Sequence, residues 1–485
     1  MVDLFIAGAA AITVMAVACF SARVFIDGDT NWHVAAGRWI LAHHTVPATD
    51  PFSYTYAGHR WIAHEWLSEV MMALAYLAAG WSGVVLLIGL AAALAFALIA
   101  DELRLWMGPV GQAVGLALCF ACLEPFLYAR PHILATPVLV FWTRRLLAAR
   151  REGRAPSIAL TPLMALWANM HASFIFGLGI IGPFALEALL ERGHRLRVIR
   201  DWGAFGLLAG AFALATPHGL AGIEFPFQVL GLKVLPNILE WRGATFGEPT
   251  LFEGALLGVL FLGLWRGVRV PPLRLILLVG LAHMALQHVR QQAVLAALAP
   301  LLLAEPFGRA LQPARDGPRL ARIPGFTPPW RVPSVAVASM IAVVALGVAA
   351  VRLAAPLVRR DNPNVPVTAF AHVPPQLLGQ PVLNEYAFGG YLIFKGVKPY
   401  VDGRADMYGD AWVQEYLALV GGQQPDVDRA FKRWDIRWTI LAPKDALVRQ
   451  LDARPGWKRV YSDPFAVVQA REDALQASPS KGAAR

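Results

Sequence analysis

Long apolar segments recur along the first 350 residues of this chain, and they constrain its fold more than any other feature. Hydrophobic residues make up 57% of the chain and charged residues only 16%, whereas soluble domains are about a quarter charged. We therefore expect an α-helical polytopic membrane protein with about 11 spans, within a range of roughly 11–13. The segments that predict spans cover residues 4–22, 84–100, 112–123, 132–147, 158–168, 174–190, 202–215, 251–265, 275–285, 293–303 and 334–351.

Arginines gather in the gaps between these segments and account for much of the net charge of +10. Loops rich in Lys and Arg stay in the cytoplasm, so four arginine groups predict the cytoplasmic face. No nucleic-acid partner is needed to explain the charge. We expect a multi-pass protein of a bacterial-type inner (plasma) membrane. The groups are Arg144, Arg145, Arg150, Arg151 and Arg154; Arg192, Arg195, Arg197 and Arg200; Arg266, Arg269 and Arg274; and Arg309, Arg315, Arg319, Arg322 and Arg331.

The polar stretch after the first apolar segment, residues 25–69, contains three aspartates, five histidines, four tryptophans and two glutamates. Such a stretch indicates one wall of a site at the water–lipid boundary. We expect residues 23–69 to form an external loop with an amphipathic helix on the membrane surface from about Thr30. Residues 66–79 fit either a short span or a helix that only dips into the membrane. With the arginine groups in the cytoplasm, the number of spans must be odd. The eleven predicted spans meet this condition only if residues 66–79 do not cross the membrane.

Asp27 and Asp29 stand two residues apart where the first apolar segment ends. Carboxylates at such a place can act as a general base or coordinate a divalent cation, Mg²⁺ or Mn²⁺. The alternative is that they are solvated interface residues or caps of the following helix. The sequence favours neither the functional nor the structural interpretation of the two aspartates.

Three further side chains of the same loop are candidates for substrate binding: His33, His64 and Glu65. His33 belongs to the expected surface helix. His64 and Glu65 stand where the next helix begins, where a glutamate also favours the helix dipole. Asp50 precedes a proline and fits a turn former better than a binding residue.

Five ionisable residues come from separate loops that the arginine groups place on the external face: Arg130, His132, His171, His288 and Arg290. Charged groups at membrane depth are costly and usually face a cavity. Arginine suits a phosphate because its guanidinium makes bidentate contacts. Each residue alone could instead be a snorkelling interfacial side chain. Together they favour a site for an anionic headgroup.

The composition changes after the last apolar segment and predicts three parts for the chain. Residues 1–355 form the transmembrane domain, 356–471 an extracytoplasmic α/β domain, and 472–485 a disordered tail. Strands are expected at 381–383, 391–394, 438–441 and 465–469, and helices near 411–420, 426–434 and 444–453.

Asp402, Arg404 and Asp406 cluster after a short apolar piece in this domain, close to Gly389 and Gly390. Polar clusters of this kind are typical binding positions, here for an acceptor. An Asp–Arg network that only holds a loop is an equally good interpretation.

The motif GDTNWHVAAGRWI, residues 28–40, followed by DPFSY, residues 50–54, resembles the GT-C class of integral-membrane glycosyltransferases. The order of a first span, an acidic external loop, many spans and an external α/β domain is similar as well. The resemblance implies polyprenyl-phosphate-linked sugars as donors and an essential carboxylate in the first external loop. Here that is Asp29, with Asp27 beside it.

A weaker resemblance joins residues 384–394 and 400–410 to the catalytic subunits of oligosaccharyltransferases. The segment lacks the paired tryptophans and the aspartate that bind an acceptor peptide, so peptide N-glycosylation is not expected. The second external loop also has no clear acidic pair.

We interpret the chain as an enzyme that moves a sugar from a polyprenyl-phosphate donor to an external glycan or lipid acceptor, such as a surface polysaccharide. Asp29 takes the acceptor proton, and Arg130 or Arg290 stabilises the leaving phosphate. Membrane lipids are the other expected partners. The alternative is a non-enzymatic transporter or assembly subunit for surface glycans, but we see no similarity between two halves of the chain of the kind that many transporters show.

Overall fold

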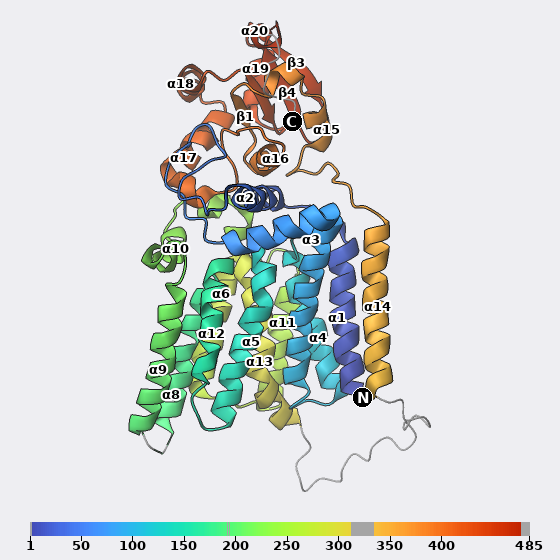
Figure 1. The fold of residues 1–485 in the computed structure, drawn as a ribbon, viewed down its shortest axis with the longest axis vertical. Coiled ribbons are helices and arrows are strands. Elements are labelled where there is room, and N and C mark those ends of the chain that lie inside the picture. The colour runs from blue at the N-terminus through green and yellow to red at the C-terminus, as the bar shows by residue number, and fades with distance from the viewer. Residues whose placement is uncertain (1, 192, 194, 312–333, 477–485) are drawn as a thin grey trace.

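A bundle of helices carries a small α/β domain at one of its ends, and helix α2 (Asp29–His43) lies between the two (Figure 1). This computed structural model describes residues 2–191, 193, 195–311 and 334–476. The other helices of the lower part are α1 (Val2–Phe20), α3 (Trp66–Leu103), α4 (Pro109–Leu123), α5 (Pro131–Arg151), α6 (Pro162–Met170), α7 (Phe174–Gly179), α8 (Ile181–Leu190), α9 (Arg195–Ala213), α10 (Leu220–Leu230), α11 (Leu251–Trp265), α12 (Pro272–Gln287), α13 (Gln292–Leu311) and α14 (Ser334–Ala354).

Five helices in the described residues are long and apolar enough to cross a membrane: Val2–Phe20, Trp66–Leu103, Pro109–Phe126, Val289–Leu311 and Ser334–Ala354. Shorter apolar helices account for several of the other predicted segments. The prediction of a polytopic membrane protein is thus confirmed, whereas the number of spans stays a prediction. The residues expected as a span at 174–190 form two short helices, α7 and α8.

Helix α3 contains the segment whose path was ambiguous. Its backbone leaves the helical region at Ala79 and Gly80, and Gly80 has a φ of 56°. Figure 1 shows the first half of α3 running along the end of the bundle and the second half descending into it. Residues 66–79 therefore lie across the bundle end, as the parity argument required.

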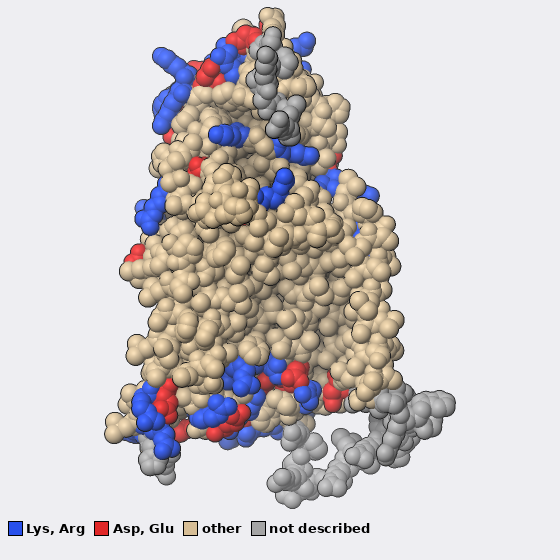
Figure 2. All heavy atoms as spheres, viewed as in Figure 1, with Lys and Arg blue, Asp and Glu red and all other residues tan. Residues whose placement is uncertain are grey.

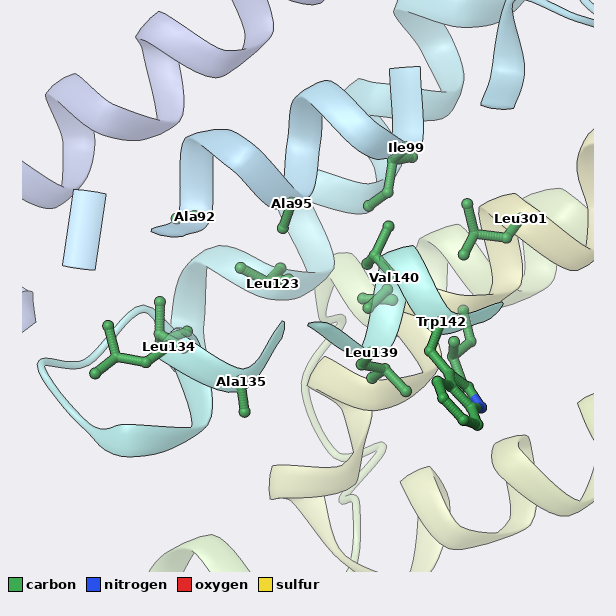
Figure 3. Close-up of a cluster of buried hydrophobic side chains, with 14 of the residues drawn as sticks. Ala92, Ala95, Ile99, Leu123, Leu134, Ala135, Leu139, Val140, Trp142 and Leu301 are labelled. Atoms are coloured by element: carbon green, nitrogen blue, oxygen red, sulfur yellow. The ribbon is translucent and has the colours of Figure 1, made fainter. Parts of the chain in front are cut away.

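The core of the bundle forms where α3, α4, α5 and α13 meet (Figure 3). Ala92 and Ala95 are buried on α3, and their small side chains let α5 approach closely. Trp142 of α5 is fully buried, and its indole N–H donates to the carbonyl of Gly177 at 3.0 Å. A tightly packed core of this kind gives the end of the bundle a fixed shape on which a site can be built.

On the face drawn in Figure 2, charged side chains gather toward the two ends of the molecule, and the surface between them is almost free of charge. At the end away from the small domain, Arg144 pairs with Asp101, and Arg151 pairs with Glu102. A surface almost free of charge is what a membrane-embedded protein requires. Arg192, Arg315, Arg319, Arg322 and Arg331 of the predicted groups lie outside the described residues. The cytoplasmic assignment of this end stays a prediction.

The small domain contains a four-stranded sheet in the order β1-β2-β4-β3. Strand β1 (Val382–Asn384) is parallel to β2 (Trp438–Leu441), and β4 (Val467–Arg471) is antiparallel to both β2 and β3 (Trp457–Ser462). The helices are α15 (Val367–Ala371), α16 (Gly389–Phe394), α17 (Ala405–Val420), α18 (Gln424–Trp434), α19 (Ala446–Asp452) and α20 (Glu472–Gln476). The α/β class and three strand positions agree with the sequence prediction.

Two predictions for this domain are wrong. Residues 391–394 belong to α16 and not to a strand, because Gly389 and Gly390 let this helix pack closely against its neighbours. A Cβ at Gly390 would lie 2.6 Å from the Gly28 carbonyl oxygen. Residues 472–476 form α20 and are not disordered, since Ala474 is buried and its carbonyl accepts from Gln380. Residues 477–485 lie outside the described residues.

Candidate active site

The first loop turns into α2 at the top of the bundle, and this turn positions both aspartates. The backbone N–H of Asp29, the first residue of α2, donates to Asp27 Oδ1 at 2.8 Å, while Gly28 is the N-cap residue of the helix. Gly28 lies against the small domain, where an added Cβ would meet the carbonyl oxygens of Ala387 and Asn364. The carboxylate of Asp29 therefore stands at the boundary between bundle and domain.

Arg130, just before α5, joins the two aspartates to a third acid. Its guanidinium pairs with Asp27 and Asp29 and donates to Glu240 at 2.8 Å. Glu240 in turn accepts from Arg290 at 3.0 Å. We call Asp27, Asp29, Arg130, Glu240 and Arg290 the arginine cluster. Its members come from four separate parts of the chain, and the structure brings the predicted Arg130 and Arg290 together with the aspartates.

The arginine cluster keeps some access to solvent. The side chains of Asp29, Arg130 and Glu240 are 19%, 15% and 26% exposed, and that of Arg290 is 30% exposed. Arg290 also lies over the ring of Trp241, with its Cζ 4.4 Å from the ring centroid. Since Arg290 pairs with one carboxylate and Arg130 with three, Arg290 keeps more donors for an anionic ligand.

Burial and neighbouring charges give the acids of this cluster different pKa values. Burial raises the pKa of Asp29 to about 7; Arg130 lowers it, while the charges of Asp27 and Glu240 raise it further. Burial acts in the same direction on Glu240, but Arg130 and Arg290 outweigh it and hold the pKa at about 2. Burial also raises the pKa of Asp27, so the aspartate pair, rather than Glu240, exchanges protons in the more neutral range, with the pKa of Asp29 at about 7.

Arg130 takes the place between the two aspartates where a divalent cation would bind both. The pair already has a cationic partner, so its geometry fits the guanidinium better than a metal ion. We assign no chemical step to Mg²⁺ or Mn²⁺ at Asp27 and Asp29, and cation binding by this pair stays a prediction.

The small domain covers Asp29 through the turn before α17. A Cβ at Gly403 would overlap Oδ1 of Asp29, so only glycine fits at this position. Tyr386 lies close enough to Asp29 that the carboxylate adds to the effect of burial in raising the tyrosine pKa. The domain therefore forms one wall of the site.

The predicted histidines form a second group beside the first. Glu65 Oε1 lies 3.6 Å from His64 Nε2 and 3.3 Å from His171 Nε2, and His33 pairs with both Glu65 and Glu69. We call His33, His64, Glu65, Glu69 and His171 the histidine cluster. Two remaining predicted histidines contact backbone carbonyls: His132 that of Phe126 at 2.9 Å and His288 that of Trp241 at 2.8 Å.

The third predicted group, in the small domain, proves to be a buried network. Arg404 donates to Asp402 at 2.7 Å and to Asp50 at 2.8 Å, and the Tyr408 hydroxyl donates to Asp402 at 2.8 Å. We call Asp50, Asp402, Arg404 and Tyr408 the Arg404 network. Asp402 and Arg404 are 0% and 1% exposed, so this geometry gives them the bracing role that the sequence left open. Their role in acceptor binding stays a prediction.

Asp406 is placed differently from its two neighbours. It stands in the first turn of α17, near His64 of the first loop. Burial raises its pKa, and the charge of His64 lowers it. Its proposed contact with an acceptor also stays a prediction.

Sequence reasoning missed Glu240 and Glu69 and assigned Asp50 to a turn. Glu240 stands in the loop of residues 217–249, which the arginine groups already placed on the external face, so a search of that loop for acids would have found it. Asp50 does cap a turn, accepting from the Phe52 N–H at 2.9 Å, but the same carboxylate also pairs with Arg404. No local pattern in the sequence indicates that second contact, which spans 354 residues.

Two solved structures share this fold over most of the chain. The archaeal oligosaccharyltransferase AglB from Archaeoglobus fulgidus, solved with an inhibitory peptide and a dolichol-phosphate, matches with a TM-score of 0.58 at 12% identity. The match covers 90% of this chain and 69% of that chain. The apo form of the Archaeoglobus fulgidus oligosaccharyltransferase matches with a TM-score of 0.56 at 11% identity, over 89% and 69% of the two chains.

The structure of ArnT from Cupriavidus metallidurans, bound to undecaprenyl phosphate, matches with a TM-score of 0.48 at 17% identity, over 96% of this chain and 98% of ArnT. No protein-family model and no curated protein sequence matches the chain. The chain therefore shares its fold with these two oligosaccharyltransferase structures over most of its length, in line with the resemblance that its first loop suggested.

Proposed function

We propose that this protein is a membrane glycosyltransferase that moves a sugar from a polyprenyl-phosphate donor to an extracytoplasmic glycan or lipid acceptor. The observation that carries the proposal is the position of Asp29. Its carboxylate lies at the top of the bundle, beneath the small domain, and burial brings its pKa to about 7. A general base works best when its pKa is close to the working pH.

The arginine cluster supports a single displacement at the sugar. The acceptor hydroxyl attacks C1 of the donor sugar, and the bond from C1 to the phosphate oxygen breaks with inversion. The hydroxyl proton passes to the Asp29 carboxylate, and polyprenyl phosphate leaves with the bonding electrons. Arg290 stabilises the charge that develops on the leaving phosphate, because it is the more exposed arginine and has donors to spare.

Asp27, Arg130 and Glu240 position this machinery rather than react. Asp27 accepts a hydrogen bond from the backbone N–H of Asp29 and shares Arg130 with it, which fixes the carboxylate of the base. Glu240 ties Arg290 to Arg130. His132, His171 and His288 are proposed to line the donor side of the site, since they come from the neighbouring loops on the same face.

The test is transfer by the purified protein. The full chain in detergent is incubated with a radiolabelled polyprenyl-phosphate sugar and with extracted envelope glycolipids and polysaccharides. Label that moves to an acceptor, with release of polyprenyl phosphate, supports the proposal. Donor that binds without any turnover across the acceptor panel, together with donor-dependent transport in vesicles, would instead support the alternative of a transporter or assembly subunit.

A further inference from the structure

The histidine cluster holds three groups that could ligate one metal ion. His33 comes from α2, Glu65 directly precedes α3, and Glu69 stands in the first turn of α3. One donor atom from each lies within 4.8 Å of the other two. His33 Nδ1 is 3.3 Å from Glu69 Oε1. Donors bound to one ion at roughly 2.0–2.2 Å are separated by distances of this size.

The two carboxylates of this group have no fixed positive partner. Glu69 is 1% exposed, and its Oε2 has no hydrogen-bond partner within the described part of the chain. The ion pairs of Glu65 and Glu69 among the described residues are formed only with histidines. Buried carboxylates are costly unless they are paired or bind a metal.

Several other acids nearby differ from Glu65 and Glu69 because each of them pairs with an arginine. Arg130 pairs with Asp27 and Asp29, and Arg404 pairs with Asp50 and Asp402. Within the described part of the chain, no arginine forms an ion pair with Glu65 or Glu69.

The histidines around these carboxylates are suited to metal binding. His33 and His171 are largely removed from solvent, with side chains 4% and 13% exposed. A neutral imidazole offers a ring nitrogen as a ligand. His171 Nε2 lies 3.3 Å from Glu65 Oε1 and is near enough to add a fourth donor. Mixed imidazole and carboxylate donors suit Zn²⁺, whereas Mg²⁺ prefers oxygen donors alone.

We propose that His33, Glu65 and Glu69 bind one Zn²⁺ ion that ties α2 to the start of α3. The two helices are in close contact beside it, where a Cβ at Gly37 would overlap the backbone carbonyl of Glu69. His33 follows Asp29 by one turn of α2. The ion therefore fixes the orientation of the helix that carries the candidate base, and it is a positioning site separate from Asp27 and Asp29.

Metal content tests the proposal without any substrate. The full chain is purified in detergent, its affinity tag is cleaved, and metals are measured by mass spectrometry. We expect about one zinc ion per chain, lost on treatment with a chelator together with a fall in melting temperature, and both restored by Zn²⁺. Replacement by Co²⁺ should give a visible absorption band. Less than about a tenth of an ion per chain, as purified and after incubation with Zn²⁺, overturns the proposal.

Variants assign the ion to these residues. His33→Gln and Glu69→Gln should each bind zinc at least ~10-fold more weakly, as changes near a metal do. The control is His43→Gln, on the exposed side of the same helix, where the ring contacts the Trp39 carbonyl at 2.8 Å; this variant should keep the ion. Full zinc content in folded His33→Gln and Glu69→Gln contradicts the site. If either variant does not fold, the wild-type zinc content and cobalt spectrum decide.

Discussion

Arg130 and Arg404 each stand between two aspartates, yet their surroundings differ. Arg404, Asp402 and Asp50 have side chains that are 1%, 0% and 0% exposed. The Arg130 side chain is 15% exposed, and its two aspartates are 11% and 19% exposed. The same ion-pair chemistry is thus fully buried in the Arg404 network and partly exposed to solvent in the arginine cluster.

The balance of charge differs as well. In the Arg404 network one guanidinium and one tyrosine hydroxyl satisfy two carboxylates, and the guanidinium also packs over the ring of Trp61, 4.8 Å from its centroid. In the arginine cluster Arg130 is shared among three carboxylates. The fully buried and satisfied Arg404 network holds two segments together. In the arginine cluster, burial and the charges of Asp27 and Glu240 outweigh the shared Arg130, and the pKa of Asp29 rises to about 7. Residue type alone does not separate a brace from a site.

The largest effect that would sharpen this comparison is expected from Asp29→Asn. The amide keeps the shape of the side chain but cannot accept the acceptor proton, so transfer should fall by about 10²–10⁴-fold. Melting temperature and expression should stay close to wild type. Initial rates with a labelled donor check the result. Asp426→Asn, in the first turn of α18, is the matched control and should keep wild-type rates. Near-normal transfer by folded Asp29→Asn would falsify the assignment.

Arg404→Ala should act on stability instead. It leaves Asp50 and Asp402 buried without a cation, which costs about 3–5 kcal/mol. We expect a large fall in melting temperature and an unchanged acceptor KM in the protein that remains folded. Arg437→Ala removes a more exposed arginine of the same domain, and should cost at most about 1 kcal/mol. A raised acceptor KM with an unchanged melting temperature would show that Arg404 binds the acceptor and does not brace the loop.

Patterns within the chain predicted the membrane class and the acidic turn at Asp27 and Asp29. Charge in the loops also placed Arg130 and Arg290 on the same side as this turn. These features depend on local hydrophobicity and on the side of the membrane that each loop faces, which the order of the spans determines.

Contacts between distant segments could not be predicted in the same way. Asp50 fits a turn by its neighbours, and its partner Arg404 is 354 residues away. Residues 391–394 suggest a strand by composition, but the packing of Gly390 against Gly28 makes them a helix. In both cases tertiary contacts with the first loop decide the outcome, and no local pattern carries that information.

Gly403→Ala tests whether the small domain closes the site. The new methyl group would overlap Oδ1 of Asp29 and push either the carboxylate or the turn aside. A displacement of about 1 Å can reduce turnover by about 10²-fold, so we expect kcat to fall with little change in melting temperature. Gly247→Ala is the control, because nothing lies within 4 Å of its added Cβ. If both variants keep wild-type kcat, the domain does not form a wall of the site.

The smallest effect is a shift in pH dependence. Below about pH 7 Asp29 is protonated and cannot act as a base, so kcat/KM should rise about tenfold per pH unit and level off above that value. Asp27→Asn removes a negative charge that raises the pKa of Asp29. Arg130 is then shared between two carboxylates, those of Asp29 and Glu240, instead of three, and both changes favour the ionised form of Asp29. The rising limb should therefore move to lower pH.

Another titrating group could produce the same rise of kcat/KM with pH. Burial would lower the pKa of His64, but the charge and hydrogen bond of Glu65 outweigh it and raise the pKa above its usual value. His64→Gln is therefore measured alongside Asp27→Asn. A limb that stays in His64→Gln and moves to lower pH in Asp27→Asn belongs to Asp29. If the rise of kcat/KM with pH disappears in His64→Gln and keeps its position in Asp27→Asn, the proton transfer belongs to the histidine cluster. The arginine cluster would then have only a structural role.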